Sequence, residues 1–137
     1  MVEAGGYILR IATEKWVNQV FGMAIYYTSL RRRWKPGQTI VFLHKTRVGD
    51  SIIGYGVIGK ICGKDELSEE EIRECEKYGW KKAIEFKYVK SVDPLPIKET
   101  FLKNSKLRGR YFHGLKLDEE QLNSIISQAE RLQHSKQ

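Results

Sequence analysis

The stretch SIIGYGVIGKIC, residues 51–62, is the part of the sequence that says most about the fold. It is apolar and rich in β-branched residues, so it is expected to form a strand. Three of its residues are glycines, Gly54, Gly56 and Gly59. Glycines weaken a strand unless it has to bend sharply or lie against another backbone, as the strands of small barrels do. The stretch therefore predicts a strongly bent strand in a small β-barrel.

The flanking segments predict further strands and a helix. Upstream, residues 35–38 (KPGQ) form a turn pattern, because proline presets φ and glycine accepts a positive φ, and a strand is expected over 39–45. Downstream, the capping box SEEE starts a helix over residues 68–78 that Gly79 ends. A long strand is then expected over 80–92, where apolar and charged residues alternate.

The two ends of the chain add helices and one more strand. The sequence predicts a strand over 7–12, a helix capped by Thr13 and ended by Gly22, a second helical turn over 25–33, a short helix over 97–103, and a last helix after Asp118. The expected fold class is α+β, a small β-barrel with a mixed, strongly bent sheet and flanking helices. We expect a single domain over residues 1–132, followed by a polar tail or the start of a linker over 133–137.

Composition excludes several classes of protein. The 137 residues are 41% hydrophobic, which is enough for one domain with its own core. Two cysteines, Cys62 and Cys75, are too few for a disulfide scaffold or a tetrahedral metal site. No apolar run approaches the ~20 residues of a membrane span, and no secretory signal is recognisable. We expect no metal, no cofactor, no membrane and a cytoplasmic location. Because no GxSxG, HExxH, paired CxxC or P-loop pattern occurs, no enzyme is predicted.

Positive charge is concentrated in two segments. The chain has 24 Lys and Arg against 17 Asp and Glu, a net charge of +7 that favours a polyanionic partner. Residues 25–47 and 101–116 contain no acid, whereas residues 64–77 hold seven acids against three bases. A basic face of this kind can follow a phosphate backbone. The predicted phosphate contacts are Arg31, Arg32, Arg33, Lys35, Lys45, Arg47, Lys106, Arg108 and Arg110.

Aromatic residues interleave with this charge. Aromatic rings stack on bases while neighbouring Arg and Lys hold the backbone. Trp16 and Phe21 lie beside a strand end and a glycine, where side chains can line a pocket. Trp34 and Phe42 are assigned to the core.

In this order, the segments resemble the EVE domain of the PUA-like superfamily, whose relatives include the YTH domains. The similarity covers nearly the whole chain, although each motif is short. The matching motifs are Thr13–Trp16, Phe21–Met23, the Lys35–Gln38 turn with the strand Thr39 to Phe42, Ile52–Gly54, and Phe101–Asn104 before a basic loop and a closing helix.

The resemblance implies a domain that takes one flipped, often methylated base into an aromatic pocket. It implies Trp16 and Phe21 as pocket walls, with Tyr26 or Tyr55 as a third. Similar domains precede the GTPase motor of McrB-type restriction proteins, which favours modified DNA as partner and allows further domains after Gln137. The alternative is a PUA-type RNA-binding module without preference for a modification. Two other classes stay open: a nuclease or transferase, and a protein-interaction role for the acidic helix 68–78.

Overall fold

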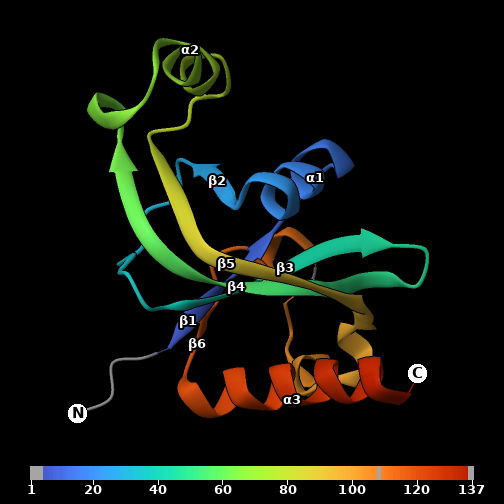
Figure 1. The fold of residues 1–137 in the computed structure, drawn as a ribbon. Helices are drawn as coiled ribbons and strands as arrows, with labels where there is room; N and C mark the ends of the chain where they lie inside the picture. Colours follow the sequence, from blue (N-terminus) through green and yellow to red (C-terminus); the bar gives the residue numbers. More distant parts are fainter. Residues whose placement is uncertain (1–4, 108, 136–137) are drawn as a thin grey trace.

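The computed structural model describes residues 5–107 and 109–135, and it confirms the α+β class (Figure 1). One mixed sheet contains β1 (Gly6–Arg10), β2 (Ile25–Thr28), β3 (Thr39–Thr46), β4 (Gly49–Gly63), β5 (Lys82–Pro96) and β6 (Lys116–Leu117). The α-helices of these residues are α1 (Glu14–Met23), α2 (Glu69–Tyr78) and α3 (Glu119–Ser135). The helix expected over 97–103 is instead two short 3₁₀ turns, Ile97–Glu99 and Phe101–Asn104.

The strand order is β2-β5-β4-β3-β1-β6, with β1 parallel to β3 and the other neighbours antiparallel. The pairing of β4 with β5 shifts register between Ile52 and Gly54 and again between Ile58 and Lys60. A Cβ on Gly54 would lie 2.4 Å from the carbonyl oxygen of Lys90, so only glycine fits there. The bend predicted from the glycines is therefore confirmed, since bulges of this kind bend a strand and increase its twist.

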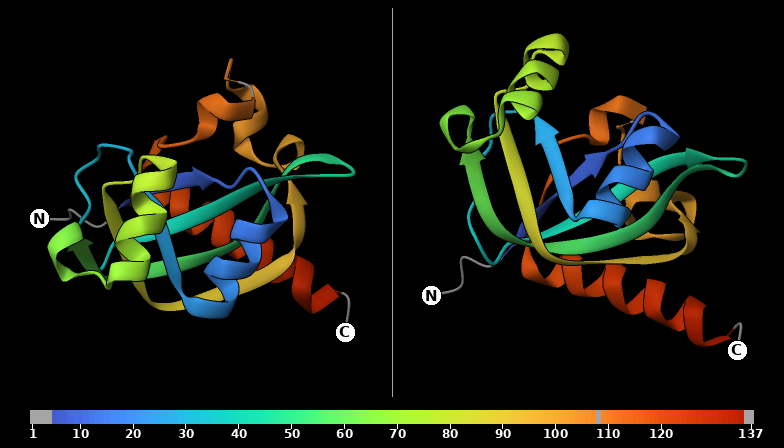
Figure 2. Two further views of the ribbon diagram at one scale, coloured as in Figure 1. Left: turned by 90° about the horizontal axis from the view of Figure 1, so that it is seen from above. Right: turned by 45° about the horizontal axis from the view of Figure 1, so that its top comes forward.

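The expected closed barrel is wrong in one respect, because the described strands form an open, curved sheet (Figure 2). A barrel needs continuous pairing between its first and last strands. Here β2, only four residues long, pairs with β5 alone, and β6 pairs with β1 alone. Residues of both β1 and β2 line one cavity, among them Arg10 and Ile25.

The helical turn expected over 25–33 is also wrong, because its first four residues form β2. Helix α1 continues one residue past Gly22 and ends where Ala24 takes a left-handed conformation with φ 55°. Ile25, two tyrosines and Thr28 are residues that favour strands. They pair with β5, starting at Ile25 opposite Glu85, so sheet pairing overrides the local helical pattern.

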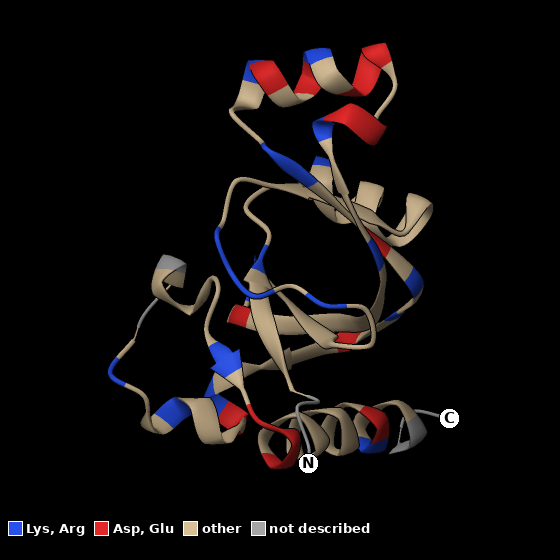
Figure 3. Cartoon of the chain, turned by 90° about the vertical axis from the view of Figure 1, so that its left-hand side faces the viewer, with Lys and Arg blue, Asp and Glu red and all other residues tan. Residues whose placement is uncertain are grey.

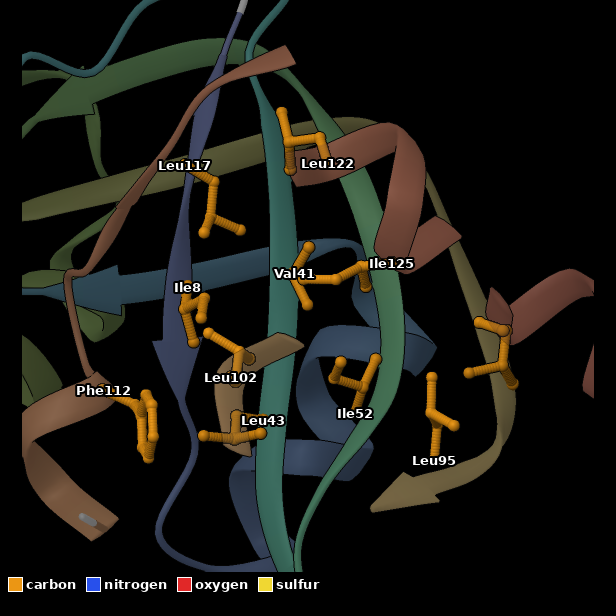
Figure 4. Packing of buried hydrophobic residues seen from close by; sticks show 12 residues of the cluster. Ile8, Val41, Leu43, Ile52, Leu95, Leu102, Phe112, Leu117, Leu122 and Ile125 are labelled. Atoms are coloured by element: carbon orange, nitrogen blue, oxygen red, sulfur yellow. The ribbon is translucent and has the colours of Figure 1, made fainter. Parts of the chain in front are cut away.

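Two hydrophobic layers pack on opposite faces of the sheet. Successive side chains of a strand point to opposite faces. Ile8 and Val41 contribute to the layer beneath α3, together with Leu122 and Ile125 of that helix (Figure 4). The other layer lies under α1 and contains Trp34 and Phe42, which confirms their assignment to the core. The sheet is thus covered by α3 on one side and α1 on the other (Figure 1).

Helix α2 begins and ends as predicted. The Ser68 hydroxyl accepts a hydrogen bond from the backbone N–H of Glu71, and the Glu71 carboxylate accepts one from the N–H of Ser68, at 3.2 and 3.0 Å. Gly79 follows the helix with φ 76°. Both ends of α2 are therefore fixed locally, and this sets where the residues after it enter the fold. None of the helices within the described ranges has the length and apolar character required to cross a membrane.

Candidate functional site

A cavity of about 240 Å³ lies between the end of β1, helix α1, strand β2 and the segment that joins α2 to β5. Its size is near the lower end for small-molecule sites and suits a single heterocycle. Five aromatic residues line it, and we call this set the aromatic pocket: Trp16, Tyr26, Tyr27, Tyr78 and Trp80.

Trp80 is the centre of the aromatic pocket. It stacks on Tyr78 with ring centroids 4.6 Å apart and on Tyr27 at 5.4 Å. Trp16 meets Trp80 edge to face at 5.0 Å and Tyr78 at 5.3 Å. Stacked and edge-to-face pairs at these distances are the favourable arrangements of aromatic rings. Four of the five rings, all except that of Tyr26, therefore form one packed cluster, with residues from α1, β2, the last residue of α2 and the α2–β5 connection.

Of the two tyrosine hydroxyls of β2, only that of Tyr27 has a hydrogen-bond partner within the described residues. The Tyr27 hydroxyl donates a 2.6 Å hydrogen bond to the Glu71 carboxylate of α2. This bond lowers the pKa of Glu71, and burial together with the same bond raises the pKa of Tyr27. Burial raises the pKa of Tyr26 to about 12, so its hydroxyl keeps its proton at neutral pH. The Tyr27 bond ties α2 to the wall of the aromatic pocket.

Two polar residues are among those that line the cavity, Arg10 and Gln19. The Arg10 guanidinium pairs with Asp50, which is not part of the lining, at 3.1 Å, and both side chains are largely buried. The side-chain amide of Gln19 lines the cavity and makes no hydrogen bond within the described part of the chain. An amide presents donors and an acceptor to the edge of a ring, whereas the rings themselves stack on its face.

The cavity lies next to basic residues through a short chain of contacts. The backbone N–H of Arg10 donates to Nδ1 of His113 at 2.9 Å. The Arg32 side chain donates from Nε to the carbonyl oxygen of Gly114, also at 2.9 Å. Burial, and then the charges of Arg32 and Arg10, lower the pKa of His113, so this ring is neutral at neutral pH. The backbone of Arg10 and the side chain of Arg32 therefore both bond to the segment His113–Gly114.

The predicted phosphate contacts divide into separate groups. We call Arg31, Arg32, Arg33 and Lys35, between β2 and β3, the basic loop (Figure 3). Its three arginines and Lys116 line a shallow depression. Lys45 and Arg47 lie at the other end of β3, about 25 Å from the basic loop at the usual rise per residue. The structure therefore does not bring them together with the loop.

The structure describes only part of the third predicted group, which consists of Lys106, Arg108 and Arg110. Lys106 is exposed between two 3₁₀ turns. Arg108 lies outside the described residues, and so does the side chain of Arg110. Lys116, which the sequence reasoning left out of the phosphate contacts, belongs to the depression with the basic loop.

Of the four predicted pocket walls, the structure brings together Trp16 and Tyr26. Phe21 packs edge to face on Phe42, with centroids 5.6 Å apart. Its ring also fills the space above Gly54 and belongs to the core under α1. Tyr55 points to the opposite face, where its hydroxyl donates a hydrogen bond to Glu130 of α3.

Sequence reasoning missed three walls: Tyr27, Tyr78 and Trp80. Its only available signal was the pair of aromatics on either side of Gly79, directly after the capped helix. Among the described residues, no three His, Cys, Asp or Glu side chains are grouped so that they could hold a metal ion.

Neither a protein-family model nor a curated protein matches this chain. Solved structures do match. The ASCH protein from Zymomonas mobilis superposes with a TM-score of 0.63 at 14% identity, covering 88% of this chain and 92% of that one. The YTH domain of Zygosaccharomyces rouxii MRB1 protein, solved with N6-methyladenosine RNA, gives 0.60 at 10% identity, covering 93% and 88%. The Mmi1 YTH domain gives 0.63 at 8% identity, covering 94% and 76%.

The chain therefore has the fold shared by ASCH and YTH domains. The similarity of fold to YTH domains that the sequence resemblance implied is confirmed. Membership of the EVE family and a role in McrB-type restriction stay predictions.

Proposed function

We propose that this chain is a nucleic-acid-binding domain that accepts one modified base in the aromatic pocket. The observation that carries the proposal is an aromatic-lined cavity that is connected to the basic loop by two hydrogen bonds, from the Arg10 backbone to His113 and from the Arg32 side chain to Gly114. Stacking holds the face of a base at ~1–3 kcal/mol per base. Lys and Arg beside the cavity neutralise the phosphates on either side of it.

Extruding a base from a duplex costs a few kcal/mol, so stacking alone roughly offsets that cost. Gln19 and the neutral Tyr26 hydroxyl are then the groups that select among bases by hydrogen bonding to the ring edge. A methyl group that reaches the apolar wall contributes ~0.8 kcal/mol through burial. The modification therefore sharpens a preference that stacking and edge contacts create.

Two kinds of nucleic acid are candidates. The sequence resemblance favours modified DNA, as in McrB-type restriction. The structural similarity to a YTH domain solved with N6-methyladenosine RNA supports RNA instead. The alternative is a PUA-type RNA-binding module without preference for a modification. Such a module would bind RNA through the basic loop, and no base would enter the aromatic pocket. We further propose that the domain has no catalytic activity of its own and acts in the cytoplasm.

The test is a fluorescence-anisotropy titration with matched DNA and RNA oligonucleotides. Each is unmodified or carries N6-methyladenine or 5-methylcytosine, at about 50 mM and about 200 mM salt. Tighter binding to one modified oligonucleotide, retained at the higher salt, supports the proposal and names the ligand. Equal and steeply salt-dependent binding to all of them would leave only the basic loop as the binding surface. Absence of binding at the lower salt would reject the proposal.

A further inference from the structure

A second hollow, of about 180 Å³, shares three aromatic rings with the pocket but opens toward α2. We call it the acidic recess. Its ring walls are Trp16, Tyr27 and Trp80. The rest of the lining consists of Gln19 and Met23 of α1 and three glutamates of α2: Glu70, Glu71 and Glu74. Figure 3 shows how acidic residues are concentrated on α2 and the turn before it, away from the basic loop. The combination of aromatic rings and carboxylates is the chemistry that receives an organic cation.

The three carboxylates are not equivalent. Glu71 is occupied by the Tyr27 hydroxyl and by the capping bond to Ser68. Within the described residues, the carboxylates of Glu70 and Glu74 have neither a hydrogen bond nor an ion pair. They stand four residues apart on one face of α2, an arrangement of like charges that destabilises a helix. A bound cation would remove this repulsion.

Two rings of the same cluster already carry an ammonium group. The Lys15 Nζ lies 4.7 Å from the centroid of Trp16, and the Lys77 Nζ lies 5.3 Å from that of Tyr78. Both distances are within the range of cation–π attraction. These contacts are independent of the glutamates, and they show that the outer faces of the cluster are accessible to positive charge.

We propose that the acidic recess binds a lysine side chain of a protein partner, with methylated lysine preferred. A nucleic-acid strand is unsuited to this hollow, because its phosphates would be repelled by Glu70 and Glu74. Lysine has a long flexible stem that carries its charge into a hollow. Methylation keeps the charge and adds apolar surface against the rings. The inference does not rest on the nucleic-acid proposal, although the two hollows share ring walls.

The test is isothermal titration calorimetry of the full chain with three short peptides of one sequence. The central residue is trimethyllysine, lysine or norleucine, which has no charge. We expect the affinity to fall in that order, with norleucine roughly fivefold or more below trimethyllysine. Equal binding of the norleucine peptide, or no binding of any peptide at millimolar concentration, would overturn the proposal.

Charge-matched double variants locate the site. Glu70→Gln with Glu74→Gln should weaken binding of the trimethyllysine peptide by roughly fivefold or more. Glu69→Gln with Glu76→Gln removes the same charge from exposed positions of α2 outside the recess, and it should change the affinity by less than about twofold. An equal loss in both variants would refute the location. Binding of the cationic nucleoside 7-methylguanosine in place of the peptides would reject a protein partner.

Discussion

Replacing Trp80 with alanine is the most direct perturbation of the aromatic pocket. Trp80 contacts Trp16, Tyr27 and Tyr78, so its removal dismantles the wall on which a base would stack. Stacking contributes ~1–3 kcal/mol per base, which corresponds to a roughly 5- to 150-fold loss of affinity. We expect this loss only for the oligonucleotide whose modified base enters the pocket. Binding of the unmodified oligonucleotide, carried by the basic loop, should persist with its salt dependence unchanged.

The variant also weakens the fold, and the assay must separate this effect. Each aromatic pair contributes ~0.5–1.5 kcal/mol, and Trp80 is only partly buried, so we expect destabilisation of about 2–3 kcal/mol. Urea unfolding at 25 °C measures this term, and anisotropy is then recorded where the variant is folded. Trp80→Phe keeps a ring and should retain most of the preference for the modified base.

Tyr88→Ala is the control, because Tyr88 is an exposed aromatic of β5 (52%) outside the pocket. It should leave both stability and binding nearly unchanged. A folded Trp80→Ala variant that kept the full ratio of modified to unmodified binding would refute the pocket assignment. A loss of both kinds of binding in equal proportion would mean that Trp80 supports the whole binding surface and does not read the base.

Three further changes test separate parts of the structure. Arg33→Ala should weaken binding of all oligonucleotides alike and reduce the salt slope by about 1, as a phosphate contact does; a change limited to one sequence in anisotropy titrations would contradict this role. Tyr27→Phe removes the hydrogen bond to Glu71 and should lower the free energy of unfolding by about 1–2 kcal/mol at pH 7. The folded pKa of Glu71 lies below its ordinary value, so the stabilisation by this hydrogen bond is present above pH 4.5 and is lost as the pH falls through the folded pKa. The free energies of unfolding of the original chain and of the Tyr27→Phe variant, measured by urea titration, should therefore converge in acid. Tyr55→Phe removes the bond to Glu130 and should cost about 1 kcal/mol in unfolding while binding stays unchanged; altered binding would place Tyr55 in the site after all.

The bends of the sheet could be predicted from the sequence, whereas its closure could not. Glycine positions report a local need for backbone space, and Gly54 meets the carbonyl oxygen of Lys90 as expected of such a site. Closure depends on whether the two edge strands, β2 and β6, pair with each other, and in the described sheet each pairs with one inner strand instead. No local pattern encodes whether two edge strands meet. The strand β2 was missed for a similar reason, because its pairing with β5 spans about sixty residues.

The pocket residues show where helical geometry could have improved the prediction. Trp16 and Phe21 are five residues apart on α1, and at 3.6 residues per turn they point about 140° apart. They could not both face one pocket, and the structure places Phe21 in the core. Tyr55 follows a register shift in β4, and a bulge of this kind reverses the alternation of faces. Trp80 was missed because its place depends on how α2 folds back onto Tyr27.

The charge around the aromatic pocket determines how a nucleic-acid strand can approach it. On one side, Arg32 of the basic loop bonds to Gly114, and the neighbouring His113 accepts a hydrogen bond from the backbone of Arg10 in the pocket lining. On the other side, the same rings are bordered by the glutamates of α2. A phosphate backbone is attracted to the first side and repelled from the second, so a strand that inserts a base should run along the basic loop and turn away from α2. Under the proposed function, the acidic helix would exclude phosphate from this side of the pocket, and its recess would stay open to a partner of positive charge.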